Sequence, residues 1–455
     1  MNIIKQIKSY IPESIHALSA LYIQQVGLSL LVKVFSVLIT LFYVPVVLGF
    51  LNQEKYGIWI TLTTVVNWIR VLDIGMGNGM RNKLAESIAL KEYEKGRIYI
   101  STTYGILGGI FLVVLIIFVL INPYLEWQLI LNSTSIEVAD LQKLTLIVVS
   151  FIIIGFILQP IVLIYDAHGQ SVAGGVIQLI ISALSFILVL AGTYLFEKGD
   201  IVLLGWIVTG IPILVYIVTT IYTFGYKFPH LRPSFKKIRI SESGNLLRLS
   251  FQFFVLQITA MIVFSSIPFV VAHLFSPNEV TIYNITNTLF NVPAMVMSLI
   301  ATPLLPLVTQ AFAKKDYNWI NSMLQKMNMV SLIMSIGVIL LIFISPVIFN
   351  IWIGGKVRIP FDLSIAIGLY TVINIITVPF SIFINGIGKI RILVILAPFT
   401  IGVFIGLSII LSRILSNVIG VSIALSLSSL IGLIVTPFVL KKYNAIKFPL
   451  KPKLR

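Results

Sequence analysis

The sequence has no cysteine and very little charge. The lack of cysteine among the 455 residues excludes disulfides, thiolate metal sites and cysteine nucleophiles together. Charged residues make up only 11% of the chain, whereas a soluble globular domain has about 25%. A chain so poor in charge cannot cover a globular surface with polar groups, and 58% of its residues are apolar. These proportions predict a protein whose solvent is lipid.

The motifs that carry enzyme chemistry are missing as well. The sequence has no HExxH zinc motif and no phosphate-binding P-loop. Its four histidines are scattered, so they make no metal-ligand set. The glycines of the stretch 75–79 have GxGxG spacing, but Met80 stands where the dinucleotide fingerprint needs its last glycine. We therefore expect no enzyme active site, no metal and no cofactor, with H⁺ or Na⁺ as a coupling ion left open.

Long apolar runs recur along the whole chain. A helix needs about 20 residues to cross a bilayer, and twelve runs qualify. They lie near residues 26–50, 56–76, 98–122, 144–167, 171–196, 201–225, 249–274, 281–312, 327–352, 363–387, 392–412 and 418–440. Since lipid offers no partner to backbone amides, each run should satisfy its own backbone as a helix. The sequence thus predicts an all-α polytopic membrane protein with about 12 transmembrane helices.

The positive charge, a net +16, is distributed unequally between the predicted loops. With the first residue placed in the cytoplasm, 24 of the 32 Lys and Arg residues fall on inward segments and 6 on outward ones. This bias is the positive-inside signal, and it predicts that both termini are cytoplasmic. The basic segments 81–97, 227–248 and 441–455 would then face anionic lipid headgroups. We expect no binding to nucleic acid.

Two pairs of segments repeat in the same order. Ala89–Tyr93 resembles Ala313–Tyr317, with both stretches following an even-numbered span. The set Pro160, Asp166, Gly169 and Gln170 recurs with identical spacing as Pro379, Asn385, Gly388 and Lys389. A duplication explains both matches. It predicts two tandem six-helix bundles, residues 1–226 and 249–455, joined by a cytoplasmic linker at 227–248, with the substrate site between them.

Polar side chains line one face of three predicted spans. Span 1 carries Lys33, Ser36 and Thr40, and span 2 carries Trp59, Thr63, Asn67, Arg70 and Asp73. Span 8 carries Asn284, Asn287, Asn291 and Ser298. Such residues are costly against lipid and usually face a bundle interior or a water-filled cavity. Lys33, Arg70, Asn67, Asn284, Asn287 and Asn291 are therefore our candidates for lining a substrate cavity.

Each candidate also has a purely structural interpretation. Arg70 and Asp73 stand three residues apart and can pair on one helix. The span 8 asparagines can hydrogen-bond neighbouring helices. Asp166 can cap the inner end of span 4, and the alternative for it is a role in proton coupling. Lys33 has no acidic residue within one helical turn, which favours cavity lining.

Several short stretches resemble one family of transporters. Tyr56–Trp59 leading into Asp73–Gly77, the region Phe275–Tyr317, and Asn385–Lys389 are similar to the corresponding regions of Wzx-type O-antigen and polysaccharide flippases. That family belongs to the multidrug/oligosaccharidyl-lipid/polysaccharide (MOP) flippase superfamily. The resemblance implies a V-shaped pair of bundles with a cationic cavity. Lys33 and Arg70 match the family's basic residues in spans 1 and 2.

The resemblance also implies a location in the bacterial inner membrane, a substrate and a direction. It predicts transfer of an undecaprenyl-diphosphate-linked oligosaccharide, an O-antigen or capsule repeat unit, from the inner to the outer leaflet by alternating access. Other polysaccharide-assembly proteins are candidate partners. A multidrug antiporter of the same superfamily and a polymerase or ligase of polysaccharide synthesis remain alternatives. An antiporter for cationic drugs would favour acidic and aromatic cavity groups. An outward-facing enzyme would need catalytic residues in a large outward loop.

Overall fold

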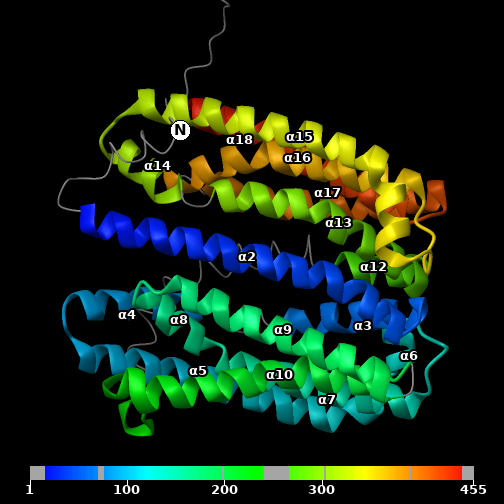
Figure 1. The fold of residues 1–455 in the computed structure, drawn as a ribbon, viewed down its shortest axis with the longest axis horizontal. Coiled ribbons are helices and arrows are strands. Elements are labelled where there is room, and N and C mark those ends of the chain that lie inside the picture. Colours follow the sequence, from blue (N-terminus) through cyan, green and yellow to red (C-terminus); the bar gives the residue numbers. More distant parts are fainter. Residues whose placement is uncertain are drawn as a thin grey trace, which may run out of the picture. The chain divides into compact units, whose positions relative to one another are not determined.

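The computed structural model describes residues 16–69, 76–196, 199–239, 266–301, 304–388 and 391–442 (Figure 1). Within these ranges the chain is almost entirely helical and contains no strand. Nine helical segments of the described residues are long and apolar enough to cross a membrane. The expectation of an all-α polytopic membrane protein is thereby confirmed.

The helices of the first half follow the predicted runs with two differences. They are α2 (His16–Phe50), α3 (Gln53–Asn67), α4 (Met76–Ala89), α5 (Tyr93–Ile121), α6 (Trp127–Ile130), α7 (Val138–Leu158), α8 (Pro160–Ala167), α9 (Ser171–Leu195) and α10 (Ile201–Tyr222). The predicted span 56–76 corresponds to α3, whose described helix ends at Asn67, and the separate helix α4 begins at Met76. The predicted span 144–167 is divided at Pro160, because proline lacks the amide that would continue the helix. After α10 the chain continues as η4 (Thr223–Lys227), η5 (Pro229–Leu231) and η6 (Phe235–Lys237).

The second half contains the longest helix of the described residues, α15. Its helices are α12 (Ile267–Leu274), α13 (Pro277–Ala301), α14 (Leu304–Ala313), α15 (Tyr317–Ile353), α16 (Phe361–Gly386), α17 (Arg391–Leu415) and α18 (Ile419–Lys442). The predicted span 281–312 corresponds to α13 and α14, and the two residues between these helices lie outside the described ranges. Most of the predicted span 249–274 lies outside the described residues, which include only its end, α12.

Contacts divide the chain into two compact units. Unit 1 consists of residues 1–50, 69–125 and 139–254, and unit 2 of residues 51–68, 126–138 and 255–455. Helix α3 and the short helix α6 therefore belong with the second half of the sequence, although they lie in the first. The prediction that the two six-helix halves superpose stays a prediction.

The internal repeat is visible in the backbone at both matched positions. Lys91 and Lys315 each have a φ of 58°, a left-handed conformation that is rare for residues other than glycine. In each turn the lysine amide donates to the carbonyl three residues earlier, at 3.1 and 3.0 Å. The next amide donates to the carbonyl five residues earlier, at 2.8 and 2.9 Å. Gly169 and Gly388 match in the same way, with φ of 72° and 70°. The duplicated segments thus form the same helix-ending turns.

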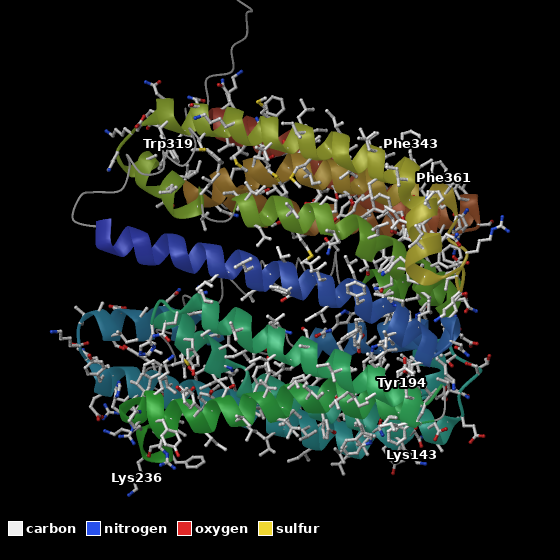
Figure 2. The ribbon with its side chains drawn as sticks, viewed as in Figure 1. Lys143, Tyr194, Lys236, Trp319, Phe343 and Phe361 are labelled. Atoms are coloured by element: carbon white, nitrogen blue, oxygen red, sulfur yellow. The ribbon has the colours of Figure 1, made fainter. Side chains whose placement is uncertain are left out.

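The described loops of unit 1 gather at its two ends. Figure 2 places Lys236 at one end of this unit and Lys143 and Tyr194 at the other. The positive-inside prediction assigns Lys236 to the cytoplasmic side of the membrane, and Lys143 and Tyr194 to the outward side. The positions of these three residues at opposite ends of unit 1 agree with that prediction. Beneath the Lys236 end lies an apolar core that includes Met80, Leu84, Ile100, Ile161, Ile164 and Leu231.

Candidate functional site

The first turns of α3 pack against the first turns of α13 in unit 2. The Tyr56 hydroxyl donates a hydrogen bond to Asn284 Oδ1 at 3.1 Å, and both side chains are at least half-buried. The Thr281 hydroxyl donates to the carbonyl oxygen of Gln53 at 2.5 Å. Tyr56 is 3% exposed, so its hydroxyl needs a partner inside the protein. We call this contact the α3–α13 junction.

Gly57 is what allows the two helices of the junction to approach so closely. A Cβ at this position would lie 1.8 Å from the carbonyl oxygen of Pro277 and 3.0 Å from the Thr281 hydroxyl oxygen. No side chain fits at that distance from a backbone oxygen, so α13 would have to move away from α3. Small residues serve the same purpose wherever membrane helices pack backbone against backbone. Gly57 belongs to the Tyr-Gly-Ile-Trp stretch of the family resemblance, but the sequence did not indicate this role.

The predicted polar face of α13 changes character along the helix. Asn284 is half-buried and accepts the hydrogen bond from Tyr56, as the structural interpretation requires. Asn287 is also half-buried and Asn291 is exposed. Within the described residues, neither of these two side chains has a hydrogen-bond partner in the protein. The polar face thus begins in the junction and continues into amides that remain open to a ligand.

The polar residues of α3 below the junction are partly satisfied by their own helix. The Thr63 hydroxyl donates to the Trp59 carbonyl at 2.9 Å, and Asn67 Nδ2 donates to the Thr63 carbonyl at 2.8 Å. Asn67 itself is exposed, and its amide oxygen accepts no hydrogen bond from any described residue. Arg70 and Asp73, the predicted pair at the end of this span, lie outside the described residues. Both interpretations of that pair stay open.

Lys33 lies on α2 in unit 1, seven positions into the apolar segment Gly27–Phe50. Its side chain is exposed, and no carboxylate of the described residues lies within ion-pair distance. The two other polar residues of its predicted face are accounted for locally. Ser36 donates to the Val32 carbonyl and Thr40 to the Ser36 carbonyl, both at 2.9 Å. Lys33 is therefore the residue of this face that still needs a partner.

Asp166 lies near the end of α8, apart from the α3–α13 junction. It is half-buried, and the positive charge of Arg81 on α4 acts on its carboxylate. A Cβ at Gly174 of α9 would meet the Asp166 carboxylate at 3.7 Å, so the carboxylate lies against the start of α9. Its neighbour His168 stacks on Phe228 with ring centroids 3.9 Å apart. This position at a helix end fits the capping interpretation, and the proton-coupling role stays a prediction.

The outward segment that an enzyme would need is packed into unit 2. Asn132 Nδ2 donates to the Ala272 carbonyl at 2.7 Å, and Trp127 and Leu131 are buried. The acidic residues of the predicted outward loop 123–143 are exposed, namely Glu126, Glu137 and Asp140. Among the described residues no group of three or more His, Cys, Asp or Glu side chains could hold a metal ion.

Comparison with known proteins places the chain in a family. The model of a family described as polysaccharide biosynthesis protein matches residues 22–312, well over half of the sequence. The chain belongs to this family. A second model, MatE, matches residues 253–412. The resemblance to Wzx-type flippases of the MOP superfamily is thereby confirmed.

Two relatives of the family align over most of the chain. A protein of Yersinia pseudotuberculosis named for O-antigen export is 24% identical over 388 residues, covering 81% of this chain and 84% of its own length. A protein of Salmonella typhimurium named for O-antigen transport is 23% identical over 384 residues, covering 82% and 85%.

Two solved structures share the fold. An inward-facing MATE-family multidrug resistance transporter of the MOP superfamily superposes with a TM-score of 0.77 at 12% identity, covering 93% of this chain and all of its own. The lipid II flippase MurJ, in an inward closed conformation, superposes with a TM-score of 0.67 at 19% identity, covering 91% and 87%. At these identities the likeness shows the fold, which is the MOP-type membrane fold.

Proposed function

We propose that this protein is a flippase for lipid-linked oligosaccharide, which moves an undecaprenyl-diphosphate-linked O-antigen or capsule repeat unit from the inner to the outer leaflet. The names of the two relatives, at more than 80% coverage of the chain, support the polysaccharide pathway. The observation that carries the proposal is Lys33, an exposed cation within a membrane span that no described carboxylate pairs with.

The chemistry of the substrate fits the polar groups that remain open. A diphosphate cannot cross hydrocarbon unaided, and fixed positive charge is the group that binds it most strongly. Lys33 and Arg70 would supply that charge, while Asn67, Asn287 and Asn291 would offer amides to sugar hydroxyls. The bound diphosphate would be the partner that Lys33 otherwise lacks, and its release would leave the site ready for the next substrate.

The α3–α13 junction would close the outer end of the path. Both helices begin after loops that the positive-inside prediction places outside the membrane. Alternating access requires such a contact to hold in one state and to break in the other. The Tyr56–Asn284 hydrogen bond and the Gly57–Pro277 contact both join the first turns of α3 and α13. Separation of these two helix ends would therefore break both contacts together.

Loss of the protein in a polysaccharide-producing bacterium should test the proposal. The undecaprenyl-linked repeat unit should accumulate, and surface polysaccharide should disappear. A plasmid-borne copy should restore the polymer, and the Lys33→Ala, Arg70→Ala double variant should fail to do so at equal protein abundance. Normal polymer from that double variant would contradict the binding role of both residues.

A multidrug antiporter is the second candidate, because the MatE model matches residues 253–412 and a MATE transporter shares the fold. The open candidate groups of this chain are basic and neutral, whereas a cationic drug needs acidic or aromatic partners. The same deletion strain discriminates the two functions. A strain that keeps its polysaccharide but becomes sensitive to cationic drugs would establish the antiporter.

A further inference from the structure

A groove of 660 Å³ opens on unit 1, between α2, α9 and α10. Its apolar lining consists chiefly of Leu28 from α2, Val172, Val176 and Ile177 from α9, and Val218 and Tyr222 from α10. The volume lies within the range of about 300–1,000 Å³ that is usual for small-molecule sites. None of the residues proposed to bind the transported headgroup lines it.

The side chains that line the groove stand on membrane-spanning helices, and several of them are exposed on the surface of unit 1. Val218 is 66% exposed, Tyr222 54% and Leu28 43%. Large apolar side chains exposed on a spanning helix contact lipid hydrocarbon. The groove also lies at one end of these spans, because Val172 begins one candidate span and Tyr222 lies close to the end of another, at Lys227. Its occupant should therefore be a hydrocarbon chain close to its own headgroup.

Two hydroxyl groups of the lining already have hydrogen-bond partners within the protein. The Tyr165 hydroxyl shares a hydrogen bond of 2.8 Å with Thr223, and the Thr219 hydroxyl donates to the Val215 carbonyl at 2.7 Å. An occupant without polar groups along its length therefore leaves the hydrogen bonds of these two hydroxyls intact.

A lysine stands beside the polar end of the groove. Lys227 Nζ donates to Oε1 of Gln170, a lining residue, at 2.7 Å and lies 4.5 Å from the centroid of the Tyr165 ring. A lysine ammonium has three N–H donors, and Gln170 takes one of them. No carboxylate of the described residues forms an ion pair with Lys227. Lys227 therefore gives this end of the groove one positive charge, which is complementary to one negative charge on a ligand.

We propose that the groove binds one acyl chain of an anionic phospholipid whose phosphate is held by Lys227. A phosphate diester carries the single negative charge that one lysine matches. The basic loop around Lys236 lies at the same end and would raise the local concentration of anionic lipid. The groove is separate from the predicted headgroup site, because Leu28 and Lys33 point about 140° apart around a helix of 3.6 residues per turn.

Native mass spectrometry of the purified full-length chain tests the site, with phosphatidylglycerol and phosphatidylethanolamine offered at equal concentration. The wild type should retain phosphatidylglycerol preferentially. Lys227→Gln should weaken that retention about fivefold, the effect of ~1 kcal/mol for one lysine near an anionic surface, and should leave phosphatidylethanolamine unchanged. Lys143→Gln is the matched control, since Lys143 is exposed and lies at the opposite end of unit 1 (Figure 2); it should change neither.

A second variant fills the groove without altering charge. Ala173→Trp should abolish retention of phosphatidylglycerol, whereas Ile187→Trp, at an exposed site of the same helix away from the groove, should not. Retention that is unchanged in both Lys227→Gln and Ala173→Trp would overturn the proposal. Equal retention of the two phospholipids by the wild type would contradict the headgroup assignment. Displacement of phosphatidylglycerol by equimolar undecaprenyl phosphate would assign the groove to the carrier lipid instead.

Discussion

The α3–α13 junction and the Lys33 region of α2 show two ways of placing polar groups in membrane helices. In the junction, hydroxyl and amide groups are bonded within the protein, as the Tyr56–Asn284 and Thr281–Gln53 hydrogen bonds show. Along α2, Ser36 and Thr40 are bonded to their own helix, and Lys33 alone of its face has no described partner. Both regions appear in the sequence as a polar stripe.

The difference separates polar groups that hold helices together from those that await a ligand. Polar groups bonded across helices stabilise a packing arrangement, at about 0.6 kcal/mol on average for each interhelical hydrogen bond. A cation without a partner contributes nothing to packing and is costly to insert. Changes in the junction should therefore alter stability and opening, while changes at Lys33 should alter transport alone.

Substitution of Gly57 should have the largest effect on the junction. Gly57→Leu places side-chain atoms where even a Cβ would lie 1.8 Å from the Pro277 carbonyl oxygen. Overpacking typically lowers the free energy of unfolding by ~1–3 kcal/mol. Because backbone atoms cannot move aside as side chains do, we expect a loss at or above the upper end of that range. The thermal midpoint of the purified protein should fall by several degrees and export should be lost. Gly109→Leu on α5, where a Cβ meets nothing within 4 Å, is the control and should behave as the wild type.

Neutralising Lys33 should give the converse result. Lys33→Ala should reduce surface polysaccharide about tenfold or more, because a hydrogen bond to a charged group contributes ~1.5–3 kcal/mol. The thermal midpoint should not fall, since the side chain has no described ion pair to lose. Lys33→Arg should retain most of the export because it keeps the charge. A destabilised Lys33→Ala protein would show that the lysine is structural and that the comparison with the junction fails.

Removing one hydroxyl from the junction should have a moderate effect. Tyr56→Phe leaves Asn284 without its donor, and a double-mutant cycle with Asn284→Ala should give a coupling of ~0.6 kcal/mol, the average for membrane proteins. The readout is the midpoint of unfolding in detergent. A coupling indistinguishable from zero would mean that the hydrogen bond does not hold the junction closed.

The ion pair between Lys237 and Glu94 should have the smallest effect. Its atoms are 2.7 Å apart, but both side chains are exposed, at 37% and 69%. Exposed pairs gain little because water screens them and the side chains lose freedom. Lys237→Gln should leave both thermal midpoint and export unchanged within error. A clear loss of export would give the linker region a function beyond its charge.

Much of the fold could be predicted because lipid imposes a simple length rule on apolar runs. The runs near 98–122, 171–196, 327–352 and 363–387 all lie in single described helices. The division of the run 144–167 is not recorded in its apolar character, and Pro160 is the residue within it that signals the break. The repeated turns at Lys91 and Lys315 were predictable, since similar residues at matched offsets form the same backbone.

The candidate site was predictable only at the level of residue types. Helical periodicity placed Asn284, Asn287 and Asn291 on one face, but it could not tell that Tyr56 engages the first of them. That distinction depends on a helix far away in the sequence. The approach of Gly57 to Pro277 and the position of Lys227 beside an apolar groove are tertiary facts of the same kind.

Flipping of a lipid-linked oligosaccharide in reconstituted vesicles tests the central claim most directly. The purified protein and a short-chain polyprenyl-diphosphate oligosaccharide are placed in liposomes, and the fraction of sugar accessible to an external glycosidase is followed over time. The account predicts rapid exposure of the sugar by the wild type and exposure at the protein-free rate by the Lys33→Ala, Arg70→Ala variant. Equal exposure by both proteins, or none by the folded wild type, would contradict it.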